Sequence, residues 1–172
     1  MRAGASLQND AKTMTDDKNF RQGLAKYLAS GHAHVALSEA VAGLSEAQLN
    51  KKLRTFPSTI WQLLEHIRMA QWDMLDFIRN PEYEEMDWPD DYWPDPKQRA
   101  TRKTINESLK AYDKDLEELR EIVLDPKNDL TRPISHGQGQ TILQEVLQVV
   151  DHASYHTGQI LVMRRAMGAW KE

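Results

Sequence analysis

The apolar residues of the chain recur every three to four positions in four long stretches, which is the spacing of one face of an α-helix. The predicted helices cover about residues 16–42, 59–79, 101–124 and 141–167. No stretch shows the alternation that is typical of a half-buried strand. Helices of this length joined by loops predict an all-α protein with the architecture of a four-helix bundle.

Several residues signal where these helices begin and end. Ser58 is the expected N-cap of the second helix. Thr141 is the expected N-cap of the fourth, with Gln144 three residues later completing a capping box. Gly168 is expected to end the fourth helix, and a short extra turn is expected at 45–49. The two long connections on either side of the second helix allow a crossover topology as well as a simple up-and-down one.

Length and composition fit one globular domain, because 40% of the 172 residues are hydrophobic and 28% are charged. Residues 1–14 are small and polar, so we expect a loose tail there and a single domain over 15–172. The net charge of −4, with scattered lysine and arginine, argues against nucleic-acid binding. No stretch reaches 18 consecutive apolar residues, which argues against a membrane-spanning helix. The chain has no cysteine, which excludes disulfides, thiolate ligands and a cysteine nucleophile, and a cytoplasmic location is expected.

Two loops interrupt the helical pattern. Residues 81–98 combine prolines, tryptophans and acidic residues, so a regular helix cannot form there. Long ordered loops often serve a site or an interface. An ordinary linker whose aromatic residues cover the end of the bundle is an equally good interpretation. The second loop contains His136, which we interpret as a polar loop residue that could lie at the mouth of a site.

The fourth predicted helix carries a narrow polar file between apolar walls. At 100° per residue the file contains one acid, two amides and two histidines, namely Glu145, Gln148, His152, His156 and Gln159. An exposed helix would instead show a broad face of lysines and glutamates. The pattern therefore predicts a buried helix whose polar file lines an internal site.

His152 and His156 lie one helical turn apart, so both rings can point towards a common ion. His66 lies inside the second predicted helix and could complete a site of three nitrogens. Asp73, two turns beyond His66, is a candidate to support a ligand from outside the coordination sphere. The alternative is a purely structural bundle whose histidines are bound by their neighbours. His32 and His34, on the first predicted helix, are interpreted as structural or surface residues.

Four segments of the chain resemble the DinB-like superfamily of bacterial four-helix-bundle proteins, also called the YfiT-like fold. The segments cover 57–67, 139–146, 151–160 and 164–168, and they contain His66, Glu145, His152, His156 and Gln159. Their order and spacing match the family from about residue 16 to the end. The resemblance implies an up-down-down-up bundle, frequent homodimers, and a divalent metal ion held by His66, His152 and His156.

Three imidazoles leave coordination positions open for water or substrate, which is the pattern of catalytic metal sites. Nitrogen ligands suit zinc, nickel or iron. The leading hypothesis is a metal-dependent enzyme in which the ion activates a thiol or a water. The resemblance implies either a thiol S-transferase, which needs a low-molecular-weight thiol as cofactor, or a hydrolase. Glu145, Gln148 and Gln159 would orient ligands or substrate, and Glu145 is the acid on the file that could act as a base.

The sequence leaves two further points open. A non-catalytic metal- or small-ligand-binding protein of the stress response is the alternative function. The fourth helix is apolar on more sides than one bundle core requires, so a homodimer is expected, although a contact with the aromatic loop would cover the same surface.

Overall fold

The computed structural model describes residues 3–29 and 33–170, with side chains described from residue 15 onward. The four longest helices are α1 (Ala3–Ala29), α4 (Ile60–Arg79), α5 (Arg102–Leu124) and α6 (Ile142–Ala166). Two short helices, α2 (Leu37–Val41) and α3 (Glu46–Leu49), lie between α1 and α4. The 3-10 helix η1 (Asp90–Tyr92) lies in the loop between α4 and α5. The prediction of an all-α fold is confirmed.

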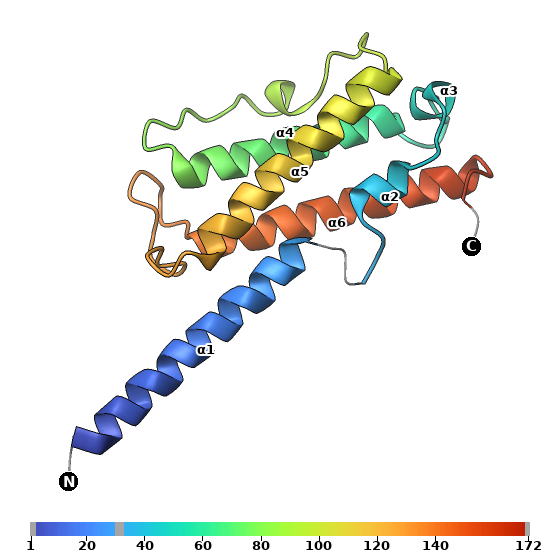
Figure 1. Ribbon diagram of the computed structural model, residues 1–172. Coiled ribbons are helices and arrows are strands. Elements are labelled where there is room, and N and C mark those ends of the chain that lie inside the picture. The colour runs from blue at the N-terminus through green and yellow to red at the C-terminus, as the bar shows by residue number, and fades with distance from the viewer. Residues whose placement is uncertain (1–2, 30–32, 171–172) are drawn as a thin grey trace.

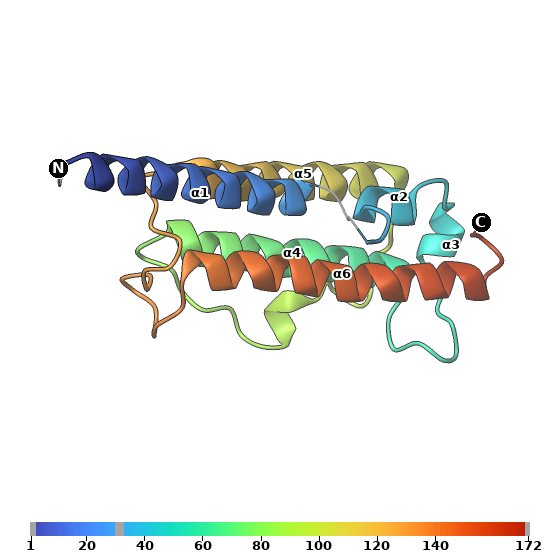
Figure 2. The same cartoon turned by 90° about the horizontal axis from the view of Figure 1, so that it is seen from below.

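The long helices form two layers (Figures 1 and 2). In Figure 2, α1 and α5 make one layer and α4 and α6 the other. The ribbon runs one way along α1 and α6 and the opposite way along α4 and α5. Because α4 contacts both α5 and α6, it links the two layers.

Side-chain caps fix the starts of the helices that build the site. α4, α5 and α6 each begin with a threonine N-cap whose hydroxyl accepts a hydrogen bond from the third helical residue. The predicted capping box of Thr141 and Gln144 is confirmed, and so is the short turn at 45–49, where α3 forms. The predicted N-cap Ser58 is wrong by one residue. Thr59 takes this role because Gln62, three positions later, returns a hydrogen bond to its backbone N–H.

The first predicted helix, 16–42, is wrong at both ends. Its backbone is already helical at Ala3, inside the expected loose tail, in a stretch with three alanines, which favour helix. The first turns of α1 extend beyond the ends of the other helices (Figure 1). The division of the chain into a tail and one domain stays a prediction.

At its other end, α1 is described as far as Ala29, and residues 33–36, before α2 begins at Leu37, are not helical. His34 lies among them, where Ser154 of α6 binds its ring, and α2 then packs its own apolar side chains against α6. These tertiary contacts outweigh the local helical pattern. His32 lies outside the described residues.

The packing of α4 against α6 sets the position of the site. Ile60, Leu64 and Ile67 of α4 and Ile160 and Met163 of α6 are all buried in one core cluster. The apolar contacts fix the rotation of each helix, so the polar file of α6 is held against α4. Among the described residues, no helix combines the length and the apolar character needed to cross a membrane.

Candidate metal centre

Three histidines from two helices converge between α4 and α6. His66 comes from α4, and His152 and His156 come from successive turns of α6. Each offers one nitrogen, and these nitrogens all lie within 4.8 Å of one another. The Nε2 atoms of His66 and His152 are 3.1 Å apart. The structure therefore brings together the three histidines that the sequence singled out.

The orientation of His66 is fixed from both the edge and the face of its ring. Its Nδ1–H donates a hydrogen bond of 2.7 Å to the backbone carbonyl of Tyr92. The indole of Trp93 stacks on the ring at 3.9 Å between centroids, with 2° between the planes. Because Nδ1 carries the proton, Nε2 keeps a lone pair, and it accepts a hydrogen bond of 3.1 Å from Nε2–H of His152.

His156 is oriented in a similar way by its own helix. Its Nδ1–H donates to the amide oxygen of Gln159 at 2.8 Å, so Nε2 is the nitrogen left for the cluster. Gln159 was predicted to orient ligands or a substrate, and its amide oxygen holds the ring of the candidate ligand His156. Its contact with a substrate stays a prediction.

Burial keeps the three rings neutral. Desolvation lowers the pKa of His66. The hydrogen bond to Tyr92 raises this pKa in part, and the positive form of His156 lowers it further. Desolvation and the neighbouring rings of His156 and His66 lower the pKa of His152 to about 4. Desolvation also lowers the pKa of His156. Neutral imidazoles have the lone pairs that metal coordination requires.

The donor set and its spacing fit a divalent ion. In a tetrahedral site with metal–nitrogen bonds of about 2.0–2.1 Å, ligand nitrogens lie roughly 3.3 Å apart. The 3.1 Å between His66 and His152 is close to this value. No carboxylate of the described residues joins the cluster, so the ligands are nitrogen alone. Three ligands would leave a position open.

Asp73 supports His66 indirectly, through the loop that follows α4. Its two carboxylate oxygens accept hydrogen bonds from the hydroxyls of Tyr83 and Tyr92, at 2.8 and 2.7 Å. The backbone carbonyl of Tyr92 is the group that orients His66. Burial and the carboxylate raise the pKa of both tyrosines, so both hydroxyls keep their protons. Loop 81–98 therefore serves the site, the first of the two interpretations that the sequence allowed.

A pocket of about 750 Å³ opens beside the cluster. His66 and His152 line it, together with Glu145 and Gln148, two of the predicted site residues. Glu145 is only 8% exposed, and burial, followed by the charge of Asp73, raises the pKa of its carboxyl group. His136 also lines this pocket and donates from Nε2 to the carbonyl of Phe77, as expected for a loop residue near a site.

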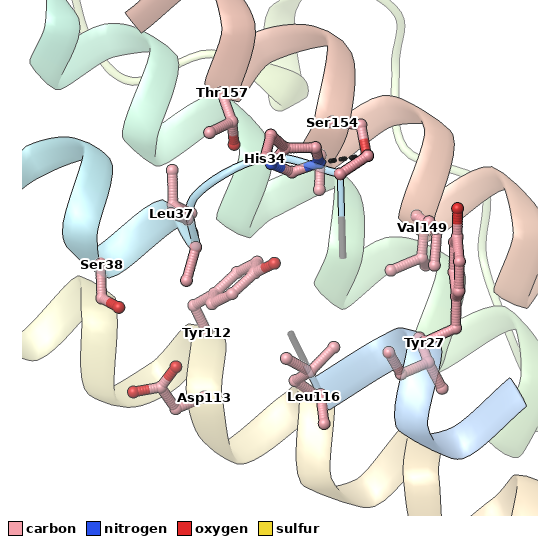
Figure 3. Close-up of a pocket in the computed structure, with 16 residues that line it drawn as sticks. Tyr27, His34, Leu37, Ser38, Tyr112, Asp113, Leu116, Val149, Ser154 and Thr157 are labelled. Carbon is pink, nitrogen blue, oxygen red and sulfur yellow. Dashed lines mark hydrogen bonds between the residues drawn. The ribbon is translucent and has the colours of Figure 1, made fainter. Parts of the chain in front are cut away.

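A second cavity, of about 310 Å³, lies between α1, α2, α5 and α6 (Figure 3). His34 reaches into it from the connection before α2. Its Nδ1–H donates to the carbonyl of Val35 at 2.8 Å, and its Nε2 accepts from the hydroxyl of Ser154 on α6 at 2.9 Å. Tyr112 and Leu116 of α5 line the opposite wall.

Sequence reasoning missed three residues that hold the cluster in place: Tyr83, Tyr92 and Trp93. The accumulation of aromatic residues in 81–98 was the signal that this loop was unusual. It could not show which residue meets His66, because the contact from Tyr92 is a backbone carbonyl and carries no side-chain signature.

Comparison with protein families gives one match. The model of the DinB superfamily matches residues 32–160, most of the chain, including the three histidines and the aromatic loop. A comparison with curated proteins and one with solved structures give no significant match. The match supports the resemblance seen in the sequence.

Proposed function

The chain belongs to the DinB superfamily, and from this premise we propose that it is a metal-dependent enzyme. The observation that carries the proposal is the convergence of three neutral imidazoles beside a pocket large enough for a small molecule. His66, His152 and His156 are the proposed ligands of one divalent ion. Zinc, nickel and iron are the candidates, because all three accept nitrogen ligands.

An ion held by three imidazoles lowers the pKa of a water or thiol bound at its open position. The proposed reaction is accordingly either transfer of a low-molecular-weight thiol or hydrolysis. The residues of the chain bind and orient the reactants. Glu145 and Gln148 contact the substrate in the pocket, while Tyr92 and Gln159 hold His66 and His156 in their ligating orientation.

The first test is elemental analysis of protein purified without a histidine tag. We expect about one divalent ion per chain, and loss of the ion in H66A, H152A and H156A. The matched control is H34A, which removes a histidine that binds α6 from the second cavity, away from the cluster. Full retention of the ion by the three ligand variants would contradict the proposal.

Activity is then measured on the metal-loaded protein with a panel of thiols, electrophiles and hydrolysable esters. Turnover that disappears in H152A supports an enzyme. A protein that binds one ion per chain and turns over none of these compounds is instead the non-catalytic metal- or ligand-binding protein.

We also propose that the chain forms a homodimer through the outer face of α6. Leu147, Tyr155 and Val162 share this face and are 50%, 64% and 50% exposed. Light scattering should give the mass of a dimer for the native chain and of a monomer for Y155E. A native monomer would refute this proposal without affecting the metal site.

A further inference from the structure

The pocket beside the histidines has an unbalanced set of charges. Asp73, Glu85 and Glu145 line it, and no lysine or arginine of the described residues does. The hydroxyl protons of Tyr83 and Tyr92 are already donated to Asp73. The lining therefore offers negative charge and hydrogen-bond acceptors in excess of free donors, which favours a cationic ligand over an anionic one.

Glu145 is the most unusual of these acids. Its residue is more than nine-tenths buried and lines the pocket, and within the described part of the chain no hydrogen bond or ion pair holds its carboxylate, whose oxygens keep some contact with the pocket. Asp73 differs, because two hydroxyls satisfy its oxygens. A carboxylate in so enclosed a place is poorly solvated, and a bound cation that donates hydrogen bonds would offset that cost.

The walls of the pocket are aromatic as well as acidic. Phe77 and Tyr83 meet edge to face at 5.1 Å, and Trp88 and Tyr92 meet at 5.3 Å. Trp88 is 71% exposed, so its ring lies at the rim where a ligand would enter. Aromatic faces attract organic cations and pack against apolar groups, whereas a hydrated metal ion gains little from them. The lining therefore suits an organic cation with an apolar body.

We propose that this pocket binds a primary ammonium compound with an aromatic or apolar body, and that Glu145 is the counter-ion of the ammonium group. The apolar body packs against the aromatic walls, and the charged end reaches the interior of the pocket. Since His66 and His152 line the same pocket, the ligand lies next to the proposed ion. The role of this ligand as a substrate rests on the proposed function. Its binding does not.

The test compares three probes of similar size, 2-phenylethylammonium, 2-phenylethanol and 3-phenylpropionate, by titration followed in nuclear magnetic resonance spectra. We expect the ammonium compound to bind at least about tenfold more tightly than the alcohol, and the carboxylate to bind most weakly. The substitution E145Q keeps the shape of the side chain and removes its charge. It should weaken binding of the ammonium compound about tenfold and change the affinity for the alcohol by no more than about twofold.

Two control variants define the site. E85Q changes an acid at the exposed rim and should weaken binding of the ammonium compound less than E145Q does. E121Q changes an exposed acid on α5, outside the pocket, and should have no effect. The amide spectrum of each variant verifies that it is folded.

Each titration is repeated on zinc-loaded and on chelator-treated protein, with zinc content measured in both. A preference for the ammonium compound in both samples supports the proposal even if no metal dependence of activity is found. Equal binding of the ammonium compound and the alcohol, absence of binding by all three probes, or an unchanged preference in E145Q would overturn it. Displacement of the ammonium compound by millimolar magnesium would overturn it too, since the acids would then form a metal site.

Discussion

Histidines lie on two sides of α6, and the contrast between them separates a histidine held by hydrogen bonds within the protein from the candidate metal ligands. In the cavity of Figure 3, both ring nitrogens of His34 are used within the protein, one by a carbonyl and one by Ser154. On the other side, His66 and His156 each bind a carbonyl or amide oxygen through Nδ1, and the second nitrogen of His66 meets only another imidazole, that of His152. Their remaining nitrogens face His152 and one another.

This difference has a direct energetic meaning. His34 would lose a hydrogen bond to a carbonyl or to a hydroxyl by binding an ion. In the cluster, the Nε2 atoms of His66 and His152 meet each other at 3.1 Å, and an ion would replace that one hydrogen bond by bonds to the lone pairs of the three rings. The cluster therefore gains from a bound ion what the cavity of His34 does not.

The largest expected effect is that of metal on stability. Zinc in thousandfold excess over its dissociation constant should raise the free energy of unfolding by about 4 kcal/mol, because only the folded chain has the site. H152A should abolish this gain, and H34A should keep it. Thermal unfolding with and without zinc measures both. An equal gain in the two variants would mean that His152 and His34 do not differ as described.

The next effect concerns the loop that orients His66. D73N removes the charge that holds the hydroxyls of Tyr83 and Tyr92, so the carbonyl of Tyr92 should no longer fix the ring. We expect zinc affinity to fall about 10- to 100-fold, the usual cost of losing such support. Competition with a chelator measures the affinity.

The matched control is D76N, one turn further along α4. Asp76 contacts Arg79 and Asn80 and not the loop residues that support His66. An affinity that falls equally in D73N and D76N would point to a general loss of negative charge and contradict the supporting role of Asp73.

Several parts of this contrast could be predicted from the sequence. The helical spacing of His152 and His156 and the apolar walls around them are local features, so the shared direction of these two histidines and the fourth helix were correctly predicted. The break before α2 was missed because His34 leaves the helical pattern for a contact with Ser154, 120 residues away in the chain. The role of Tyr92 was missed for a similar reason, since its carbonyl depends on the path of the loop.

Acid should weaken the metal-free fold. The pKa of His152 is about 4 in the folded chain, against 6.5 for the free side chain. Between these values the unfolded chain binds more protons, so the free energy of unfolding should fall as the pH drops from about 6.5 to about 4. Urea unfolding with a chelator present measures this. H152Q should show a shallower fall, and a slope equal to that of the native chain would contradict the assignment.

The smallest expected effect lies in the second cavity. S154A removes the hydroxyl that donates to His34 and should cost about 1 kcal/mol of stability. Zinc affinity should not change. S38A, in the same cavity, removes a hydroxyl that has no hydrogen bond among the described residues and should change neither quantity. A drop in zinc affinity in S154A would show that the two sides of α6 are coupled.

A crystal structure of the untagged, zinc-loaded protein with anomalous diffraction data would show whether the three histidines hold an ion. We expect one anomalous peak between α4 and α6, with nitrogens of His66, His152 and His156 at about 2.0–2.2 Å from it. An anomalous peak at another place, or zinc-loaded crystals in which the three rings turn away from one another and hold no ion, would refute the metal site.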